Sequence, residues 1–318
     1  EKTVSRAMRE VQKSNGFAFD PEQSNVVREL VGDAAIAVMV GYAGAGKSTV
    51  MGAVRHIYEG EGRRVVGGAL AGKAAVGLRD SAGIESRTLA SWEASWKAGL
   101  RNLSKGDVFV LDEAGMVSSS QMQRFVEHVK LSGAKLIVLG DARQLQPIEY
   151  GAAFRAMSDN VGYSVLSGVR RQRHDFMREA SVAFGSGRYR EGLQAYIDRG
   201  HVHVEADLSA ARSKIIQAWF GDWSAGADVL MLAHRNKDVY ALNEEARAAI
   251  KANGGLLDEV SFKAVRGERK IAIGERIVFL EKSRDLGVEN GTFATVLSHG
   301  KGVIEAEIGD GKRVRFSD

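Results

Sequence analysis

Cysteine is absent from this chain of 318 residues, proline occurs only at Pro21 and Pro147, and long hydrophobic runs are missing. Without cysteine the chain can form no disulfide and no thiolate metal site and has no cysteine nucleophile, which fits a reducing cytoplasm. The longest apolar run, residues 34–40, is far shorter than the ~20 residues of a membrane-spanning helix. We therefore expect a soluble, cytoplasmic protein without a membrane segment.

The composition is otherwise ordinary for a globular protein. Hydrophobic residues make up 44% and charged residues 26% of the sequence, which argues against a disordered or fibrous chain. The length predicts two domains. The net charge of +4 is compatible with an anionic partner without requiring one. The 37 glycines suggest tight loops or a close approach of the backbone to a ligand.

Short apolar segments alternate with helical patterns along most of the chain. The first such series predicts strands at residues 36–40, 64–66, 108–111 and 135–139, and helices from 47 onward, at 71–82 and around 122–129. Continuous apolar strands that alternate with helices predict an α/β fold with a parallel sheet covered on both faces. The pattern then restarts with a strand at 163–166, a helix at 175–184, a strand at 229–233 and a helix at 237–251.

Both ends of the chain carry local signals of a different kind. Near the N-terminus, Asp20, Pro21 and Gln23 predict a helix start, with the three residues at the N-cap, N1 and N3 positions. After residue 255 the sequence pattern changes to short segments in which apolar and polar residues alternate, separated by turn residues. This pattern predicts a small antiparallel barrel. Its expected strands lie at 276–279, 293–296, 303–306 and 313–316.

A glycine-rich loop follows the first predicted strand. Its sequence, Gly41-Tyr42-Ala43-Gly44-Ala45-Gly46-Lys47-Ser48, matches GxxxxGK[ST] between a strand and a helix. Glycines let backbone N–H groups turn inward around a phosphate, and the helix N-terminus adds partial positive charge. Lys47 would reach the β- and γ-phosphates, and the Ser48 hydroxyl would ligate Mg²⁺. The alternative is a chance match, which the strand-then-helix context disfavours.

Two acidic residues, Asp112 and Glu113, come directly after the strand at 108–111. Asp112 would hold Mg²⁺ through water, and Glu113 would orient and deprotonate an attacking water. Taken alone, such a pair is usually a solvated turn. Because this pair lies downstream of the phosphate loop, we favour the catalytic interpretation over a solvated turn.

Polar residues also follow the next two predicted strands. Gln144 lies in the loop after residue 139, where it could contact a γ-phosphate or its water, and the alternative is an ordinary polar loop. The run 170–173 contains three arginines, any of which could act as an arginine finger on a γ-phosphate. For Arg170 and Arg173 we favour the alternative, a basic face that binds DNA phosphates.

Taken in order, these motifs resemble those of the superfamily 1B DNA helicases of the RecD-like kind. The resemblance is strongest to the helicase segment of TraA-type conjugative transfer relaxase/helicases and extends over residues 17–298. Its specificity comes from the ordered set rather than from any one motif. The matching segments are 21–23, 41–49, 71–75, 86–92, 110–117, 140–147, 171–172, 274–279 and 285–291.

The resemblance implies a P-loop NTPase fold of two RecA-like lobes with ATP between them, single-stranded DNA across their top and 5′ to 3′ translocation. It implies lobe 1A at residues 1–157, the first part of lobe 2A at 158–255, and an inserted SH3-like β-barrel subdomain 2B at 256–318. The implied partners, besides single-stranded DNA, are a relaxase domain and other conjugation proteins.

The same resemblance implies roles for individual residues. Gln23 would read adenine, Glu113 would be the base, Gln144 would contact the γ-phosphate, and Arg171 would be the finger. Mg²⁺ would be held by Ser48 and Asp112. The nucleotide-binding set would be Gln23, Gly41, Ala43, Gly44, Ala45, Gly46, Lys47, Ser48 and Thr49. The residues expected near DNA are Lys73, Thr88, His234 and Arg235, although Thr88 is nearly as well explained as a strand or cap residue.

The sequence also departs from the family. Only residues 93–107 are available for the hairpin that splits the duplex, and the motifs V and VI of the family are missing. We therefore expect an incomplete second lobe, slow ATP hydrolysis and little unwinding. The alternative is a non-motor, ATP-binding module that contacts DNA or another protein.

Two weaker patterns complete the survey. His201 and His203 stand on alternate positions, but two histidines without a third ligand nearby are a poor basis for a metal hydrolase. Trp92 and Trp96, at helical spacing, could stack on bases, and the core face of a helix explains them better.

Overall fold

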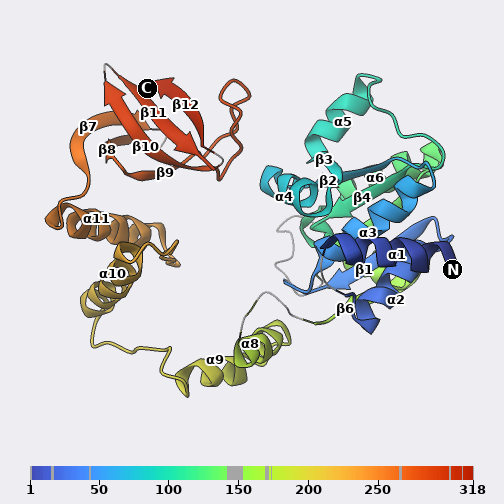
Figure 1. Cartoon of the computed structure of the whole chain (residues 1–318), viewed down its shortest axis with the longest axis horizontal. Helices are drawn as coiled ribbons and strands as arrows, with labels where there is room; N and C mark the ends of the chain where they lie inside the picture. Colours follow the sequence, from blue (N-terminus) through green and yellow to red (C-terminus); the bar gives the residue numbers. More distant parts are fainter. Residues whose placement is uncertain are drawn as a thin grey trace. The chain divides into compact units, whose positions relative to one another are not determined.

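The computed structural model describes residues 2–15, 18–42, 44–141, 153–168, 172, 174–264, 267–300, 302–309 and 311–317. The chain divides into two compact units, Glu1–His201 and Val202–Asp318 (Figure 1). Of the described residues, none belongs to a helix long and apolar enough to cross a membrane. Each unit has its own sheet or sheets, so the two are best described one at a time.

The first unit is built on a six-stranded, fully parallel sheet in the order β3-β2-β4-β5-β1-β6. The strands are β1 Ile36–Gly41, β2 Val65–Ala69, β3 Glu85–Thr88, β4 Val108–Asp112, β5 Lys135–Gly140 and β6 Ser164–Leu166. The helices are α1 Lys2–Asn15, α2 Pro21–Leu30, α3 Lys47–Gly60, α4 Gly72–Ala82, α5 Leu89–Lys97, α6 Ser119–Ser132, α7 Ala153–Val161, α8 Asp175–Gly185 and α9 Tyr189–Ile197, with a short 3-10 helix η1 at Ala114–Met116. The predicted parallel α/β sheet is confirmed.

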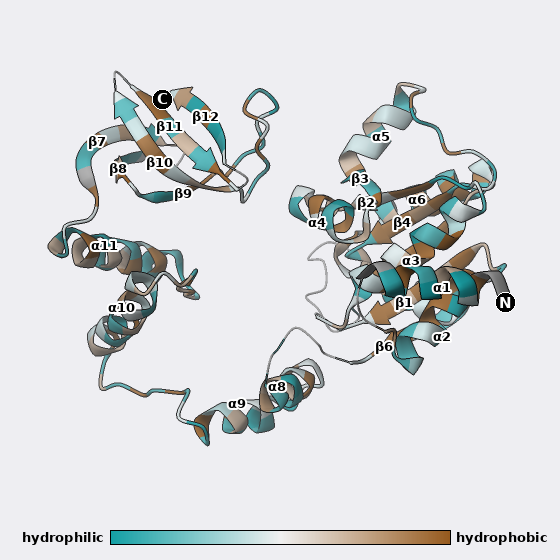
Figure 2. Ribbon diagram, viewed as in Figure 1, coloured by the Kyte–Doolittle hydropathy of each residue, from teal (hydrophilic) through white to brown (hydrophobic). Residues whose placement is uncertain are grey.

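Helices cover both faces of this sheet, which explains its continuous apolar strands. In β4, Val108 and Val110 belong to the core shared with α1, α2 and α3, whereas Phe109 and Leu111 belong to the core shared with α5 and α6. All four side chains are fully buried. Figure 2 shows β1 and β4 as apolar segments within this layered unit. Because helices bury both faces of the sheet, successive residues of a strand are all apolar, and apolar and polar residues do not alternate along it.

Two glycines in β2 let the covering helices approach the sheet closely. A Cβ at Gly67 would lie 2.7 Å from Cδ2 of Leu78 in α4, and one at Gly68 would lie 2.9 Å from Cδ2 of Leu89 in α5. Trp92 of α5 is 1% exposed and donates from Nε1 to the Gly67 carbonyl at 2.8 Å. Trp96 packs partly buried against the same core. The core-face interpretation of the two tryptophans is therefore confirmed.

The predicted start of α2 is confirmed in detail. The Gln23 backbone N–H donates to Oδ1 of Asp20 at 2.7 Å, and the Asp20 backbone N–H donates to Oε1 of Gln23 at 3.3 Å. With Pro21 at the first helical position, these bonds form a capping box that satisfies two N–H groups otherwise left without partners.

The second series of strands differs from the prediction. Strand β6 forms at the expected place but pairs with β1 at the edge of the first sheet, so it does not begin a new one. The strand expected at 229–233 is wrong: these residues have no regular structure, and Leu230 and Leu232 are 67% and 82% exposed. Between residues 167 and 256, the described part of the chain contains helices and no strand that could pair with this segment.

The second unit combines two helices with antiparallel strands. The helices are α10 Leu208–Ser224 and α11 Asn236–Ala252; β7 Leu257–Ala264 and β8 Gly267–Ile273 form a hairpin; and β9 Arg276–Val278, β10 Phe293–Gly300, β11 Val303–Ile308 and β12 Lys312–Ser317 form a sheet in the order β12-β11-β10-β9. The four predicted strands are confirmed, and the β7–β8 hairpin was not predicted. Phe262 and Ile271 of the hairpin share one core with Val296 and Ile304 of the sheet.

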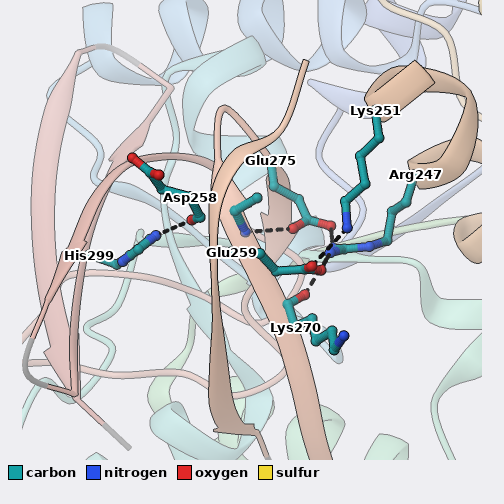
Figure 3. Close-up of polar contacts among 8 residues, drawn as sticks. Arg247, Lys251, Asp258, Glu259, Lys270, Glu275 and His299 are labelled. Atoms are coloured by element: carbon teal, nitrogen blue, oxygen red, sulfur yellow. Dashed lines mark hydrogen bonds and ion pairs between the residues drawn. The ribbon is translucent and has the colours of Figure 1, made fainter. Parts of the chain in front are cut away.

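Arg247 joins α11 to the β-strands of the second unit. Its guanidinium pairs with Glu259 of β7 and with Glu275, and it donates to the Lys270 carbonyl at 2.8 Å (Figure 3). Lys251, one turn further along α11, also binds Glu259, at 2.8 Å. The Arg247 side chain is 13% exposed. A partly buried, multiply bonded guanidinium holds its partners in one geometry better than an exposed ion pair does.

Lys135 is an unusual buried cation at the start of β5. It is 6% exposed, and its Nζ donates to the Gly32 carbonyl at 2.5 Å. Burial, together with the positive charge of Arg63, lowers the pKa of Lys135 to about 8. In the unfolded chain the amine keeps its ordinary pKa of roughly 10.4.

The depressed pKa of Lys135 predicts a specific pH dependence of stability. Between about pH 8 and pH 10.4 the unfolded chain binds more protons than the folded chain, so stability rises with pH in this window. Replacing Lys135 by Met should remove that rise. The measurement is the melting temperature of wild type and Lys135→Met from pH 7 to pH 9.5. Parallel curves for the two proteins would contradict the assignment.

Candidate nucleotide-binding site

The phosphate loop turns between β1 and α3 as predicted. Gly44 and Gly46 have φ values of +82° and +88°, a left-handed conformation that side chains disfavour, and Gly46 is the N-cap of α3. At Gly41 a Cβ would lie 3.0 Å from Cγ of Lys47. Ala43 lies outside the described residues. Glycine is therefore favoured at Gly44 and Gly46 by the backbone conformation, and at Gly41 a side chain would crowd Lys47.

The Lys47 amine points back toward its own loop. Its Nζ donates to the Gly41 carbonyl at 2.6 Å and lies 3.4 Å from the Tyr42 carbonyl. The loop is in turn held to the edge strand, because the Tyr42 backbone N–H donates to the carbonyl of Leu166 in β6 at 3.3 Å. An amine that donates to neutral carbonyls can exchange these hydrogen bonds for bonds to a phosphate, because a charged phosphate is a stronger acceptor.

Asp112 and Glu113 stand at the carboxyl end of β4. The Glu113 backbone N–H donates to Oδ1 of Asp112 at 2.8 Å, and Glu113 has a φ of +52°. A non-glycine residue in this region is strained, and such strain is concentrated at functional sites. The Asp112 carboxylate therefore lies against the backbone of Glu113 at the end of the strand.

Both carboxyl groups are harder to ionise than usual. Burial raises the pKa of Asp112, against a hydrogen bond from Glu113 and the charge of Lys47. Burial also raises the pKa of Glu113, the Asp112 charge adds to that rise, and Lys47 opposes it. A carboxyl with a raised pKa is a better proton acceptor when ionised. The electrostatics of Glu113 therefore suit a general base.

A single cavity of about 700 Å³ brings the loop and the carboxyls together. Its walls include Gly44, Lys47, Ser48, Asp112 and Glu113, with part of α4 on another side. The volume is in the range of nucleotide and small-ligand sites. A larger open hollow of about 910 Å³ along residues 187–199 contains no comparable set of groups.

The donor set in this cavity fits a magnesium nucleotide. Lys47 and the N-terminus of α3 supply positive charge for phosphates, whereas the Ser48 hydroxyl and the Asp112 carboxylate are oxygen ligands of the kind that Mg²⁺ prefers. Among the described residues, no group of three or more His, Asp and Glu side chains could hold a metal ion by itself.

Asp141 is a cavity residue to which we assigned no role from the sequence. It follows β5, is 8% exposed, and lines the cavity with Asp112 and Glu113. The signal was available, because Gly140-Asp141 ends a strand in the same way as Asp112-Glu113. That β4 and β5 are neighbours in the sheet is what brings the two ends together.

Thr49 also lines the cavity, whereas three other predicted residues of the first unit do not. Gln23 is buried at the start of α2 and does not line the cavity. Lys73 is exposed at the start of α4, and Thr88 caps α5 by accepting a bond from the Ser91 backbone N–H at 3.2 Å. The alternative reading of Thr88 as a cap residue is thus confirmed.

The second unit contains two of the predicted DNA-contact residues. His234 is exposed, and Arg235 donates from Nε to Oδ2 of Asp238 at 2.8 Å at the start of α11. Gln144 and Arg171 lie outside the described residues.

Comparisons with known proteins identify a family and related sequences. The AAA domain family matches residues 18–207. The probable conjugal transfer protein TraA of Sinorhizobium fredii is 44% identical over 308 residues, covering 96% of this chain and 28% of that protein. The chain therefore spans little more than a quarter of that relative.

Two solved structures show the same fold at low identity. The Pif1 helicase from Candida albicans is 16% identical with a TM-score of 0.59, covering 94% of this chain and 77% of that chain. The Pif1 helicase from Bacteroides, in complex with ADP-AlF3 and single-stranded DNA, is 16% identical with a TM-score of 0.51, covering 94% and 74%.

Replacing Lys47 by Ala should weaken ADP and ATP binding by more than about tenfold, because the phosphates lose a charged donor. The measurement is isothermal titration with Mg-ADP. Lys97→Ala, at the exposed end of α5, is a matched control and should bind as wild type does. Wild-type affinity in Lys47→Ala would contradict the phosphate-loop assignment.

Replacing Glu113 by Gln should leave Mg-nucleotide binding intact and lower ATP turnover by about 10²- to 10⁴-fold, since the amide keeps the shape but cannot accept a proton. Binding and turnover are measured on the same preparation. Unchanged turnover would show that Glu113 is not the base.

Proposed function

Because this chain belongs to the AAA domain family and has the fold of the Pif1 helicases, we propose that it is an ATP-dependent single-stranded DNA translocase or helicase segment of a conjugative DNA-transfer protein. One observation carries the proposal: Lys47 and Ser48 line the same cavity as Asp112 and Glu113. Nucleotide binding needs the first pair, and hydrolysis needs the second.

In the proposed site, the loop 41–49 would hold the phosphates of ATP, and Ser48 and Asp112 would hold Mg²⁺. Mg²⁺ held by these two residues would supply positive charge to the phosphates. Glu113 orients a water and takes its proton, and its raised pKa supports that role. We propose Gln23 as the residue that reads adenine. As a buried member of the capping box, the Gln23 side chain has a structural role as well.

Two further groups complete the proposed hydrolytic site. Gln144 contacts the γ-phosphate, and Arg171 supplies positive charge to it as a finger. In measured cases an arginine finger contributes about 10³- to 10⁵-fold to the rate. Strand β6, which precedes Arg171 in the chain, ends beside the phosphate loop: Leu166 pairs with Gly41, and its carbonyl accepts from the Tyr42 backbone N–H at 3.3 Å. This placement supports the proposal.

The proposed nucleic-acid partner is single-stranded DNA, moved in the 5′ to 3′ direction. The Bacteroides Pif1 structure contains single-stranded DNA, and this chain shares its fold. We propose Lys73, Thr88, His234 and Arg235 as contacts. Lys73 and His234 are exposed and available, whereas Thr88 and Arg235 already bond to Ser91 and Asp238.

We also propose a place for this segment in a larger protein. The similarity to TraA supports a role in conjugal transfer beside a relaxase domain. Within the chain, the proposed divisions are lobe 1A at 1–157, the first part of lobe 2A at 158–255, and subdomain 2B at 256–318. The common core of β7, β8 and the four-stranded sheet supports the last of these.

A second candidate is a non-motor module that binds ATP and contacts DNA. One observation favours it: between residues 167 and 256 the described chain forms helices and no strand, and so contributes no second parallel sheet. A P-loop motor couples hydrolysis to closure of one lobe on another. Turnover that responds to DNA separates the two candidates.

The proposed function predicts that single-stranded DNA raises ATP turnover several-fold, because DNA binding favours the arrangement that hydrolyses ATP. The measurement is phosphate release with and without an oligothymidine, with Glu113→Gln as the inactive control. DNA affinity should fall at least about tenfold between 50 and 200 mM salt, since the contacts are cations on phosphates. Turnover that ignores DNA would favour the non-motor module.

A further inference from the structure

The carboxylate of Glu22, in the first turn of α2, gathers three donors from the end of β6. It accepts from the Ser167 hydroxyl at 2.7 Å, from the Ser167 backbone N–H at 3.0 Å and from the Gly168 backbone N–H at 3.3 Å. Although partial burial raises it, these bonds lower the pKa of Glu22 overall. The carboxylate therefore stays ionised and makes charge-assisted bonds.

The segment that Glu22 holds is itself bonded to the phosphate loop. Leu166, the last residue of β6, is 1% exposed and pairs with Gly41 in the sheet register. Its carbonyl accepts from the Tyr42 backbone N–H at 3.3 Å. The Gly41 and Tyr42 carbonyls are the atoms on which the Lys47 amine rests. Hydrogen bonds and the backbone between them therefore connect Glu22 to Lys47 through the end of β6 and residues 41–42.

We infer that Glu22 is a positioning residue for the phosphate loop, acting through the end of β6 on the backbone that presents Lys47. This inference rests on the proposed function. It gives α2 a second role beside the one proposed for Gln23: Glu22 would hold the loop that receives the phosphates, and Gln23 would read the base. A loop held in its bound conformation binds phosphates with less ordering cost.

The same helix offers a matched control. Glu29 lies seven residues after Glu22, on the same face of α2, and accepts a bond from the hydroxyl of Ser164, the first residue of β6. That contact joins the same two elements but lies at the opposite end of the strand from Leu166 and the loop. Loss of Glu29 should therefore affect packing without affecting the loop.

The test compares Glu22→Ala, Glu29→Ala and wild type by isothermal titration with Mg-ADP and with Mg-pyrophosphate, which has no base. We expect Glu22→Ala to bind both ligands about tenfold more weakly, the loss expected of a charge-assisted network. Glu29→Ala should bind both within about twofold of wild type. Melting temperatures show that all three proteins are folded during the titrations.

Several outcomes would overturn the inference. One is equal binding by Glu22→Ala and wild type, and another is an equal loss in Glu29→Ala. A loss for ADP that spares pyrophosphate would mean that Glu22 acts through the base side. If Glu22→Ala fails to fold, Glu22→Gln keeps one acceptor and should bind pyrophosphate between wild type and Lys47→Ala; wild-type binding would again overturn the inference.

A double variant separates this inference from the proposed function. If Glu22 acts through Lys47, adding Glu22→Ala to Lys47→Ala should weaken pyrophosphate binding by less than Glu22→Ala does alone. Additive losses would overturn the positioning role. Weak binding by Lys47→Ala supports the proposed nucleotide site whatever Glu22 does, so the failure of one is distinguishable from the failure of the other.

Discussion

Parallel pairing of β1, β4, β5 and β6 is the constraint on which the candidate site depends. In a parallel sheet all strands end at the same edge, so whatever follows each strand meets there. Gly41 pairs with Leu166, and Val40 with Gly140, which sets the phosphate loop beside the ends of β5 and β6. β4 delivers Asp112 next to β5. A cavity with groups from residues 42–49, 112–113 and 139–141 is the direct result.

The electrostatics of this edge are as specific as its geometry. Two neighbouring carboxyls are kept partly buried, which raises the pKa of each, and the Lys47 charge partly offsets the cost. The strained backbone of Glu113 adds to that cost. The stability of the sheet below, with β4 buried on both faces, is what holds such an arrangement in place. Partly buried carboxyls with raised pKa values are typical of functional sites, because packing alone gives no reason to keep such residues there.

In the second unit, a helix is held against a small β-structure. Its apolar core is shared between the β7–β8 hairpin and the four-stranded sheet. α11 is tied to that structure by Arg247 and Lys251 near its end, and its start is fixed by Asp238, which binds both Arg212 and Arg235. Ion pairs at both ends thus hold α11, whose N-cap residue is the proposed DNA contact Arg235.

Local signals in the sequence determined much of this protein. The phosphate loop, the capping box of Asp20 and Gln23, four strands of the parallel sheet (β1, β2, β4 and β5) and four antiparallel strands each depend on residues close together in the chain, so spacing and turn chemistry suffice. The short strand β3, with few apolar residues, was not predicted. Only the tertiary structure decided that β6 joins the first sheet and that residues 229–233 form no strand, because a strand needs a distant partner. The same holds for Asp141 and for Glu22: their roles arise from elements that are remote in sequence and adjacent in the fold.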